Sequence, residues 1–328
     1  MSILVPFVNW LEPLLASGVM QPGDHICYCP DGDLHLFPLQ YIRFQNNYLI
    51  DTFSLSRTQG VASILDMLAK PTRQVSQFLV VQATAEQDDR DQKKKAAFGE
   101  IGNWLTTQMT GQILIDEQAD FEYITKQSAS GRLIHFSTHG YFPYKTMGEE
   151  GGSPYYDSGL LVYADGQRPV NLPEDAPTKS QVRAETHKEE EEKENKKLKN
   201  WQRRNPFLLS PDRLLRAGWN IDGSHVTLQG CVSGQAKEGI GGDALGLDWA
   251  LLQSGANSLL STGWNVDVYW ANDFCRLFYQ SWQQGHSKAE AHRQACLLLK
   301  AKRKAETVPD DLISPYYWAA FSLTGDWR

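Results

Sequence analysis

Four short apolar runs constrain the fold of this chain more than any other feature. They lie at residues 78–83, 133–138, 226–229 and 258–262, and turn-forming residues bound each of them. Strands that are apolar on both faces are typical of a parallel sheet covered on each side by helices. Amphipathic stretches alternate with these runs, as crossover helices do in such sheets. The sequence therefore predicts an α/β fold with a mostly parallel sheet flanked by helices on both faces.

Capping residues mark the starts of two predicted helices. Ser210 and Pro211 supply an N-cap and a first-turn proline ahead of an apolar pair. Ser287 and Glu290 form a capping box that predicts a helix to about Lys304.

Two further helices and a pair of strands are predicted from the sequence. Residues 243–254 and 268–284 repeat apolar positions with the helical period, and each segment ends near a glycine suited to a C-cap. Residues 25–29 and 48–54 are interpreted as a hairpin-like pair of strands ahead of the main sheet, and their connection carries Asp31, Gly32 and Asp33.

The chain of 328 residues is expected to form one domain, 1–328, because α/β folds routinely organise this length around one sheet. Residues 173–205 interrupt the pattern with runs of Glu and Lys and almost no apolar side chains. Such a segment cannot bury enough surface to offset its ordering entropy, which predicts a flexible insertion. It is either a solvated loop or charged helix without function, or a regulatory loop that is nicked during activation.

Composition excludes several classes of function. A net charge of -7 disfavours binding to nucleic acid or to an anionic membrane surface. No signal peptide and no run of about 18 apolar residues is present, so we expect a cytoplasmic protein. The five cysteines match no disulfide framework and no zinc pattern, and we expect reduced thiols, no metal and no cofactor.

Two residues with catalytic chemistry follow predicted strands. His139 ends one apolar run and Cys231 ends another, and glycines surround both positions. Active sites of open α/β sheets lie beyond the carboxyl ends of the strands. If the two strands are neighbours, the imidazole of His139 can act as general base for the thiol of Cys231. The backbone N–H groups of Gly140 and Cys231 are the candidate oxyanion hole, whereas His135 is expected to be a core residue.

Several motifs around these residues resemble a known family. They are LIHFSTHG at 133–140, LQGCVSG at 228–234, GDALG at 242–246, PDGDLHLFP at 30–38, SGLL at 158–161, SGANS at 254–258, STGWNVD at 261–267 and PYYWAAF at 315–321. In this order they resemble the CHAT-domain peptidases, bacterial relatives of caspases, separases and gingipains. The resemblance implies a caspase-like sheet and a cysteine endopeptidase with a Cys231–His139 dyad, cleaving a specific protein in a regulated bacterial signalling or defence pathway.

The resemblance also suggests where a substrate binds. In caspases a glutamine two residues before the nucleophile helps to form the specificity pocket, and Gln229 holds that place here. Asp31, Asp157 and Asp267 are candidates for an acidic pocket wall, although Asp267 is also explained as the N-cap of the helix that follows it.

The segment after the 258–262 strand offers a further substrate contact. Trp264 and Asn265 are expected at the edge of the cleft, where a substrate would pair as an added strand.

A different class of function remains open beside proteolysis. The turn at the nucleophile, with Gly230 before Cys231 and Val232 after it, departs from the family's usual sequence. That departure is compatible with a catalytically inactive scaffold, and acyl transfer is another possible thiol reaction. No helical repeat or other sensor module is detectable, so an activator is expected to be a separate protein or a removed segment.

Overall fold

The structure is a computed structural model of the chain. It describes residues 9–30, 34, 37–72, 75–127, 129–141, 158–169, 206–230, 236–238, 244–305 and 314–328. The 173–205 insertion, which the sequence predicts to be flexible, lies outside these residues.

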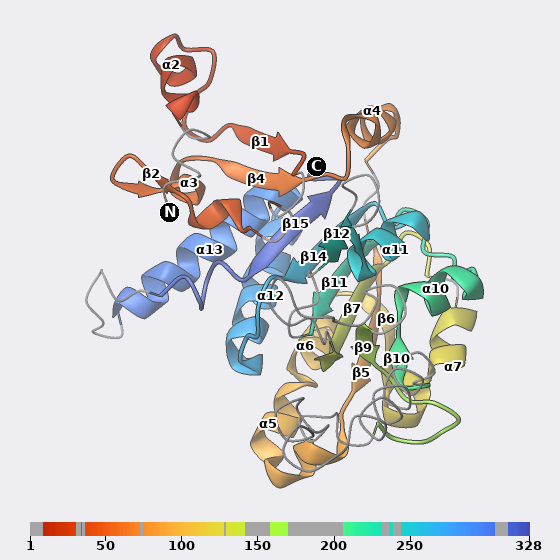
Figure 1. Ribbon diagram of the computed structural model, residues 1–328. Coiled ribbons are helices and arrows are strands. Elements are labelled where there is room, and N and C mark those ends of the chain that lie inside the picture. Colours follow the sequence, from red (N-terminus) through yellow and green to blue (C-terminus); the bar gives the residue numbers. More distant parts are fainter. Residues whose placement is uncertain are drawn as a thin grey trace, which may run out of the picture.

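An eight-stranded sheet forms the centre of the molecule (Figure 1), in the order β1-β4-β15-β14-β11-β7-β5-β6. The strands are β1 (His25–Tyr28), β4 (Ser54–Arg57), β15 (Phe321–Gly325), β14 (Ser258–Thr262), β11 (His225–Gln229), β7 (Leu133–Thr138), β5 (Gln77–Ala83) and β6 (Thr110–Ile115). Every neighbouring pair is parallel except β14 with β15. The mostly parallel sheet that the sequence predicts is therefore confirmed.

Helices cover both faces of this sheet. One face packs against α6 (Glu100–Gln108), α12 (Val268–Gln283) and α13 (Lys288–Ala305), and the other against α7 (Phe121–Lys126), α10 (Pro211–Ala217) and α11 (Leu247–Gln253). Figure 1 shows α12 and α13 on one side of the sheet and α7, α10 and α11 on the other.

Alternate residues of a single strand supply the two cores. In β5, Phe78 and Val80 belong to the cluster on the α12 side, while Leu79 and Val81 belong to the cluster on the α10 side. Successive side chains of a strand point to opposite faces, and a strand covered on both faces is therefore apolar throughout. This burial explains the continuous apolar runs in the sequence.

Smaller elements connect and flank the sheet. A three-stranded sheet, ordered β10-β9-β8, consists of β8 (Gly140–Tyr141), β9 (Gly159–Leu161) and β10 (Leu208–Leu209). The other pairs are β2 (Arg43–Phe44) with β3 (Asn47–Tyr48) and β12 (Ala236–Glu238) with β13 (Ala244–Gly246). The remaining helices among the described residues are α2 (Leu11–Ala16), α3 (Leu49–Thr52), α4 (Val61–Ala69), α5 (Gln92–Ala97), η3 (Leu39–Tyr41), η4 (Glu86–Arg90) and η5 (Asp116–Ala119).

The four predicted core strands and the predicted helix caps are confirmed. The four apolar runs are β5, β7, β11 and β14, and the hydroxyl of Ser210 accepts a hydrogen bond from the Arg213 amide at the start of α10. The Ser287 hydroxyl accepts from the Glu290 amide at the start of α13. Asp267 caps α12 by accepting from the Tyr269 amide, which confirms its role as an N-cap.

The prediction of a hairpin-like pair of strands ahead of the sheet is wrong. Residues 25–28 form β1, but its partner is β4, residues 54–57, and the two run parallel. Most of the 48–54 stretch is the short helix α3, because the Asp51 carboxylate accepts from the Tyr48 amide and closes a helical turn. Its apolar residues Leu49 and Ile50 are buried against the core from this helix.

The helix predicted over 243–254 begins later than expected. Residues 244–246 form β13 in an antiparallel pair with β12, and α11 starts at Leu247. Apolar side chains on a short strand that runs directly into a helix produce one continuous pattern, which is why the sequence did not separate the two elements.

Candidate active site

The order of the strands brings three loops together at one edge of the sheet. Strand β7 lies between β5 and β11, and all three are parallel. Their carboxyl ends therefore meet at the same edge, where ligands bind in open α/β sheets. His139 follows β7 at this edge, and Gly230 follows β11.

Asp88 contacts His139 across the loops that follow β5 and β7. Both carboxylate oxygens of Asp88 lie 3.0 Å from Nε2 of His139, and the carboxylate is almost completely buried. One of these oxygens, Oδ2, also accepts a hydrogen bond of 2.7 Å from the Ala85 amide. Burial alone would raise the pKa of Asp88, but the hydrogen bond from His139, the Ala85 amide and the charge of Lys94 hold it below its usual value. Asp88 is therefore an ionised acceptor for the His139 ring.

This contact fixes the tautomer of His139. An ionised carboxylate can only accept a hydrogen bond, so Nε2 carries the ring proton and Nδ1 of the neutral ring holds the lone pair. The ring of Phe98 packs against the imidazole with 5.1 Å between the two centroids. The side chain of His139 is thus oriented on two sides and presents Nδ1 as its proton acceptor.

Gly230 packs tightly against the loop that carries His139. A Cβ atom at this position would lie 2.6 Å from Cδ2 of Leu160 and 3.2 Å from the carbonyl oxygen of Thr138. The carbonyl oxygen of Gly230 accepts a hydrogen bond of 2.6 Å from the hydroxyl of Thr262 in β14. The residue that leads into Cys231 is therefore fixed beside His139.

Three of the predicted site residues lie outside the described part of the chain. These are Cys231, Asp31 and Asp157. The predicted nucleophile, one of the two predicted oxyanion amides and two candidate acids of the pocket wall stay predictions.

A pocket of about 90 Å³ opens beside His139. Its lining is Lys94, Phe98, Thr138, His139, Gln229, Gly230, Thr262, Val266, Asp267, Val268 and Ala271. Phe98, Val268 and Ala271 are buried and apolar, whereas Asp267 is exposed and caps α12. The deeper walls are thus uncharged. Gln229 and Asp267 both line this pocket, and their role in substrate binding stays a prediction.

The carboxamide of Gln229 is engaged in a buried network rather than free to meet a substrate. Its Oε1 lies 2.9 Å from Nε2 of His135, and its Nε2 donates to Oδ1 of Asn272 over 2.6 Å. Asn272 in turn donates to the carbonyl oxygen of Ala97. Burial lowers the pKa of His135 to about 4, so this ring is neutral and donates to Gln229. The expectation that His135 is a core residue is confirmed.

The other described candidates are Gly140, Trp264 and Asn265, and none of the three lines the pocket beside His139. Gly140 starts β8, which pairs with β9 immediately after His139. Trp264 and Asn265 lie in the segment between β14 and α12, where Asn265 is exposed and Trp264 donates from Nε1 to the Tyr316 carbonyl oxygen.

Two other cysteines are held as neutral thiols by burial. Cys275 in α12 and Cys296 in α13 are completely buried, and burial raises the pKa of each thiol above its usual value. Burial likewise raises the pKa of Cys27 in β1. A buried, protonated thiol is a poor nucleophile, and these positions do not compete with Cys231 as candidates for catalysis.

Asp88 is the site residue that the sequence did not reveal. It lies in an acidic stretch with Asp89 and Asp91, and no local pattern distinguishes the three. A signal was present nonetheless, because this stretch directly follows the β5 run, and acids after a strand next to the histidine-bearing strand are candidates to contact the histidine.

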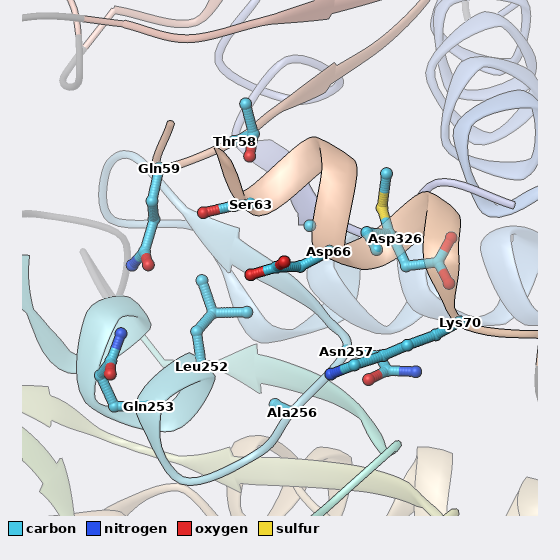
Figure 2. A pocket seen from close by; sticks show the side chains of 12 residues that line it. Thr58, Gln59, Ser63, Asp66, Lys70, Leu252, Gln253, Ala256, Asn257 and Asp326 are labelled. Carbon is cyan, nitrogen blue, oxygen red and sulfur yellow. The ribbon is translucent and has the colours of Figure 1, made fainter. Parts of the chain in front are cut away.

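A second pocket, of about 200 Å³, lies at the opposite edge of the sheet (Figure 2). Figure 2 shows Ser63 and Asp66 of α4 facing Leu252 and Gln253 of α11 across it. Asn257, at the amino end of β14, also lines this pocket, whereas Thr262 at the carboxyl end of β14 lines the pocket beside His139. The larger pocket is therefore separate from the Asp88–His139 pair.

The described residues contain neither a candidate metal site nor a candidate membrane-spanning helix. No cluster of three or more His, Cys, Asp or Glu residues has an arrangement that could hold a metal ion in that part of the chain. Within the same residues, no helix combines the length and apolar character needed to cross a bilayer.

Comparisons with known proteins show the family and the fold of the chain. The sequence matches the CHAT domain over residues 8–326. Among solved structures, the separase chain of a Saccharomyces cerevisiae separase–securin complex at 3.0 Å resolution matches with a TM-score of 0.50 and 12% identity, over 89% of this chain and 14% of that chain. The same complex at 2.6 Å matches with a TM-score of 0.49 and 12% identity, over 89% of this chain and 15% of that chain.

The chain thus spans about a seventh of the length of the yeast chain that it resembles in fold. A search of curated proteins found no match. The α/β fold is separase-like, with a mostly parallel eight-stranded sheet. From the match over residues 8–326, the chain belongs to the CHAT domain family.

Proposed function

We propose that this protein is a cysteine endopeptidase in which Cys231 is the nucleophile and His139 the general base. The observation that carries the proposal is the hydrogen bond between His139 and Asp88 at the sheet edge where Gly230 leads into Cys231. An imidazole that is oriented by a carboxylate and lies beside a candidate nucleophile is the usual arrangement of nucleophilic catalysis.

The proposed reaction has two halves. Nδ1 of His139 accepts the thiol proton of Cys231, and the thiolate attacks the carbonyl carbon of the scissile peptide bond. The C–N bond then breaks as His139 gives its proton to the leaving amine, which leaves a thioester on Cys231. Water, deprotonated by His139, attacks the thioester and releases the carboxylic acid and the thiol.

The walls of the pocket support a preference for an uncharged residue before the scissile bond. The carboxamide of Gln229 is bonded to His135 and Asn272. Lys94 and Asp267 also line the pocket but are exposed at its rim, and the Asp267 carboxylate is occupied as a helix cap. Phe98, Val268 and other uncharged groups form the deeper walls. We propose that a small or medium apolar side chain fills this pocket.

We further propose that the substrate is a protein and that a separate protein controls the activity, within a bacterial signalling or defence pathway. Membership of the CHAT domain family supports a regulated peptidase. The yeast separase with the similar fold was solved as a complex with securin, which makes control by a partner protein a reasonable analogy.

A peptide-library profile and a labelling experiment test the proposal together. Cleavage by the wild-type protein and its loss in Cys231→Ala is the expected result, while cleavage that persists in this variant would refute the assignment. A thiol-reactive peptide electrophile should label Cys231 in the wild-type protein. The control variant Cys29→Ala should be labelled at Cys231 to the same extent. Labelling of Cys231 no faster than that of the other cysteines would favour an inactive scaffold.

Asp267→Asn tests the pocket preference. Asparagine is also a good N-cap, so the variant keeps α12 and removes only the charge. An unchanged cleavage profile is expected, and loss of a preference for basic residues would contradict the uncharged pocket.

A further inference from the structure

Arg168 binds the loop that carries Asp88 with almost every donor of its guanidinium group. Nε donates to the carbonyl oxygen of Thr84, and Nη2 donates to the carbonyl oxygen of Ala85 over 2.7 Å and to the Thr84 hydroxyl over 3.1 Å. Nη1 and Nη2 also contact the carboxylate of Asp89 at 2.6 and 3.2 Å. Arginine is suited to this role because its donors form a rigid planar fork.

These hydrogen bonds act on the peptide groups that position Asp88. The carboxylate of Asp88 accepts from the Ala85 amide, and the carbonyl oxygen of the same Ala85 accepts from Arg168. Ala85 is thus fixed on one side by Asp88 and on the other by Arg168. A shift of this residue would move the Asp88 carboxylate relative to His139.

The segment that carries Arg168 also holds the backbone of His139. The Leu161 amide donates to the carbonyl oxygen of His139 over 2.8 Å. The hydroxyl of Thr138 donates to the Leu161 carbonyl oxygen over 2.5 Å. Residues 158–168 therefore contact both partners of the Asp88–His139 pair.

The position of Arg168 itself is well anchored. Ala164 and Gln167 exchange two backbone hydrogen bonds immediately before it. The Tyr163 amide donates to the Ala119 carbonyl oxygen, and the Tyr163 carbonyl oxygen accepts from the Phe121 amide. The backbone just before Arg168 and the Ala85 backbone that it contacts are each held by hydrogen bonds, so the Arg168 side chain joins two anchored parts of the protein.

We propose that Arg168 is a positioning residue that holds Asp88 against His139. The inference rests on the proposed function, since a positioning role requires that His139 acts as the base. The competing explanation is a simple ion pair with Asp89. Asp89 is about half exposed and also pairs with Lys95 over 2.6 Å. Exposed ion pairs contribute little to stability, whereas the hydrogen bonds to two backbone carbonyls are directional and specific to Arg168.

Lys95 supplies the matched control for this distinction. Lys95→Ala removes a cationic partner of Asp89 but leaves the carbonyls of Thr84 and Ala85 bonded to Arg168. Arg168→Ala removes both kinds of contact, and Arg168→Lys keeps the charge but not the fork. We expect Arg168→Ala and Arg168→Lys to lower kcat by roughly tenfold or more with little change in KM, as small displacements of catalytic groups do. Lys95→Ala should change kcat by less than about twofold, as expected when an exposed ion pair is lost.

A double-mutant cycle then separates positioning from a general structural effect. In the background of Asp88→Asn, the further change Arg168→Ala should lower kcat by no more than about twofold, because the contact that Arg168 supports is already lost. Equal losses of kcat in the wild-type and Asp88→Asn backgrounds would overturn the proposal, and so would an Arg168→Ala variant that behaves like Lys95→Ala.

A spectroscopic readout keeps the test independent of proteolysis. Proton NMR of the wild-type protein should show a downfield, exchange-protected signal from the Nε2–H group of His139 that is absent from Asp88→Asn. We expect this signal to be lost in Arg168→Lys and retained in Lys95→Ala. Its retention in Arg168→Lys overturns the positioning role even if no cleavage is detected, whereas absence of cleavage with the expected NMR pattern counts only against the protease assignment.

Discussion

Asp88 and His139 are separated by 51 positions in the sequence, yet the Asp88 carboxylate lies 3.0 Å from Nε2 of the His139 ring. The two residues meet because β5 and β7 are parallel neighbours whose following loops share one edge of the sheet. This contact gives the imidazole a defined tautomer and orientation, and several measurable consequences follow from it and from the packing around it.

Replacement of Asp88 should reduce catalysis. Asp88→Asn removes the charged acceptor and lets the amide donate to Nε2 instead, which favours the tautomer with its proton on Nδ1. We expect kcat to fall on the order of 10²–10⁴-fold, the range that a correctly placed general base contributes. Steady-state cleavage of a peptide found in the library screen measures this. Asp91→Asn is the matched control, because asparagine can replace Asp91 as the cap of α5. An equal effect of both variants would contradict the assignment.

The contact should also appear in the pH dependence of stability. The pKa of Asp88 is lower in the folded protein than its usual value of 3.8. Its ionised form therefore contributes stability that is present above pH 3.8 and is lost as the pH falls through the folded-state pKa. Urea unfolding of wild type and Asp88→Asn over a pH series should give a stability difference that shrinks in acid. Asp66→Asn, at an exposed position of α4, is the control variant measured over the same pH series.

The close contacts of Gly230 predict a geometric effect on activity. In Gly230→Ala the new Cβ would lie 2.6 Å from Leu160 Cδ2 and 3.2 Å from the Thr138 carbonyl oxygen, so the turn into Cys231 must move. We expect kcat to fall about 10–10²-fold. Gly263→Ala is the control, because Gly263 follows β14 as Gly230 follows β11 and its Cβ would meet only the Ala320 carbonyl oxygen at 3.8 Å. Cleavage rates that do not differ between the variants would contradict tight packing at Gly230.

The buried amide network predicts an effect on stability. Asn272→Ala leaves the Gln229 amide and the Ala97 carbonyl without their Asn272 partner. Each buried group left unpaired costs about 1–3 kcal/mol. Chemical denaturation should therefore show a clear loss in Asn272→Ala, while Asn103→Ala on the exposed face of α6 should stay within about 0.5 kcal/mol of wild type. A similar stability of the two variants would mean that water replaces the lost bonds.

Local patterns predicted the elements better than their pairing. The apolar runs identified β5, β7, β11 and β14, and the capping residues located the starts of α10 and α13. The same reasoning paired residues 25–29 with 48–54 as a hairpin, whereas β1 pairs in parallel with β4. A propensity describes one segment, but pairing depends on the path of the chain between segments.

The candidate site likewise contains residues that local sequence patterns could locate and contacts that they could not predict. His139 and Gln229 could be located from the sequence because each stands at the end of an apolar run. Whether the Gln229 side chain was free could not be predicted, since its partners His135 and Asn272 come from β7 and α12. Arg168 likewise gave no signal, because its role depends on carbonyl groups about 84 positions earlier in the chain.

The sequence by itself determined the α/β class, the strands that form the sheet centre and the placement of His139 at a strand end, because these follow from short-range periodicity and turn chemistry. Only the tertiary structure decided that Asp88, rather than Asp89 or Asp91, meets His139, and that Arg168 fixes the Asp88 loop. The physical reason is that strand order brings distant loops together, and the direction of each buried side chain is set by partners that lie far away in sequence.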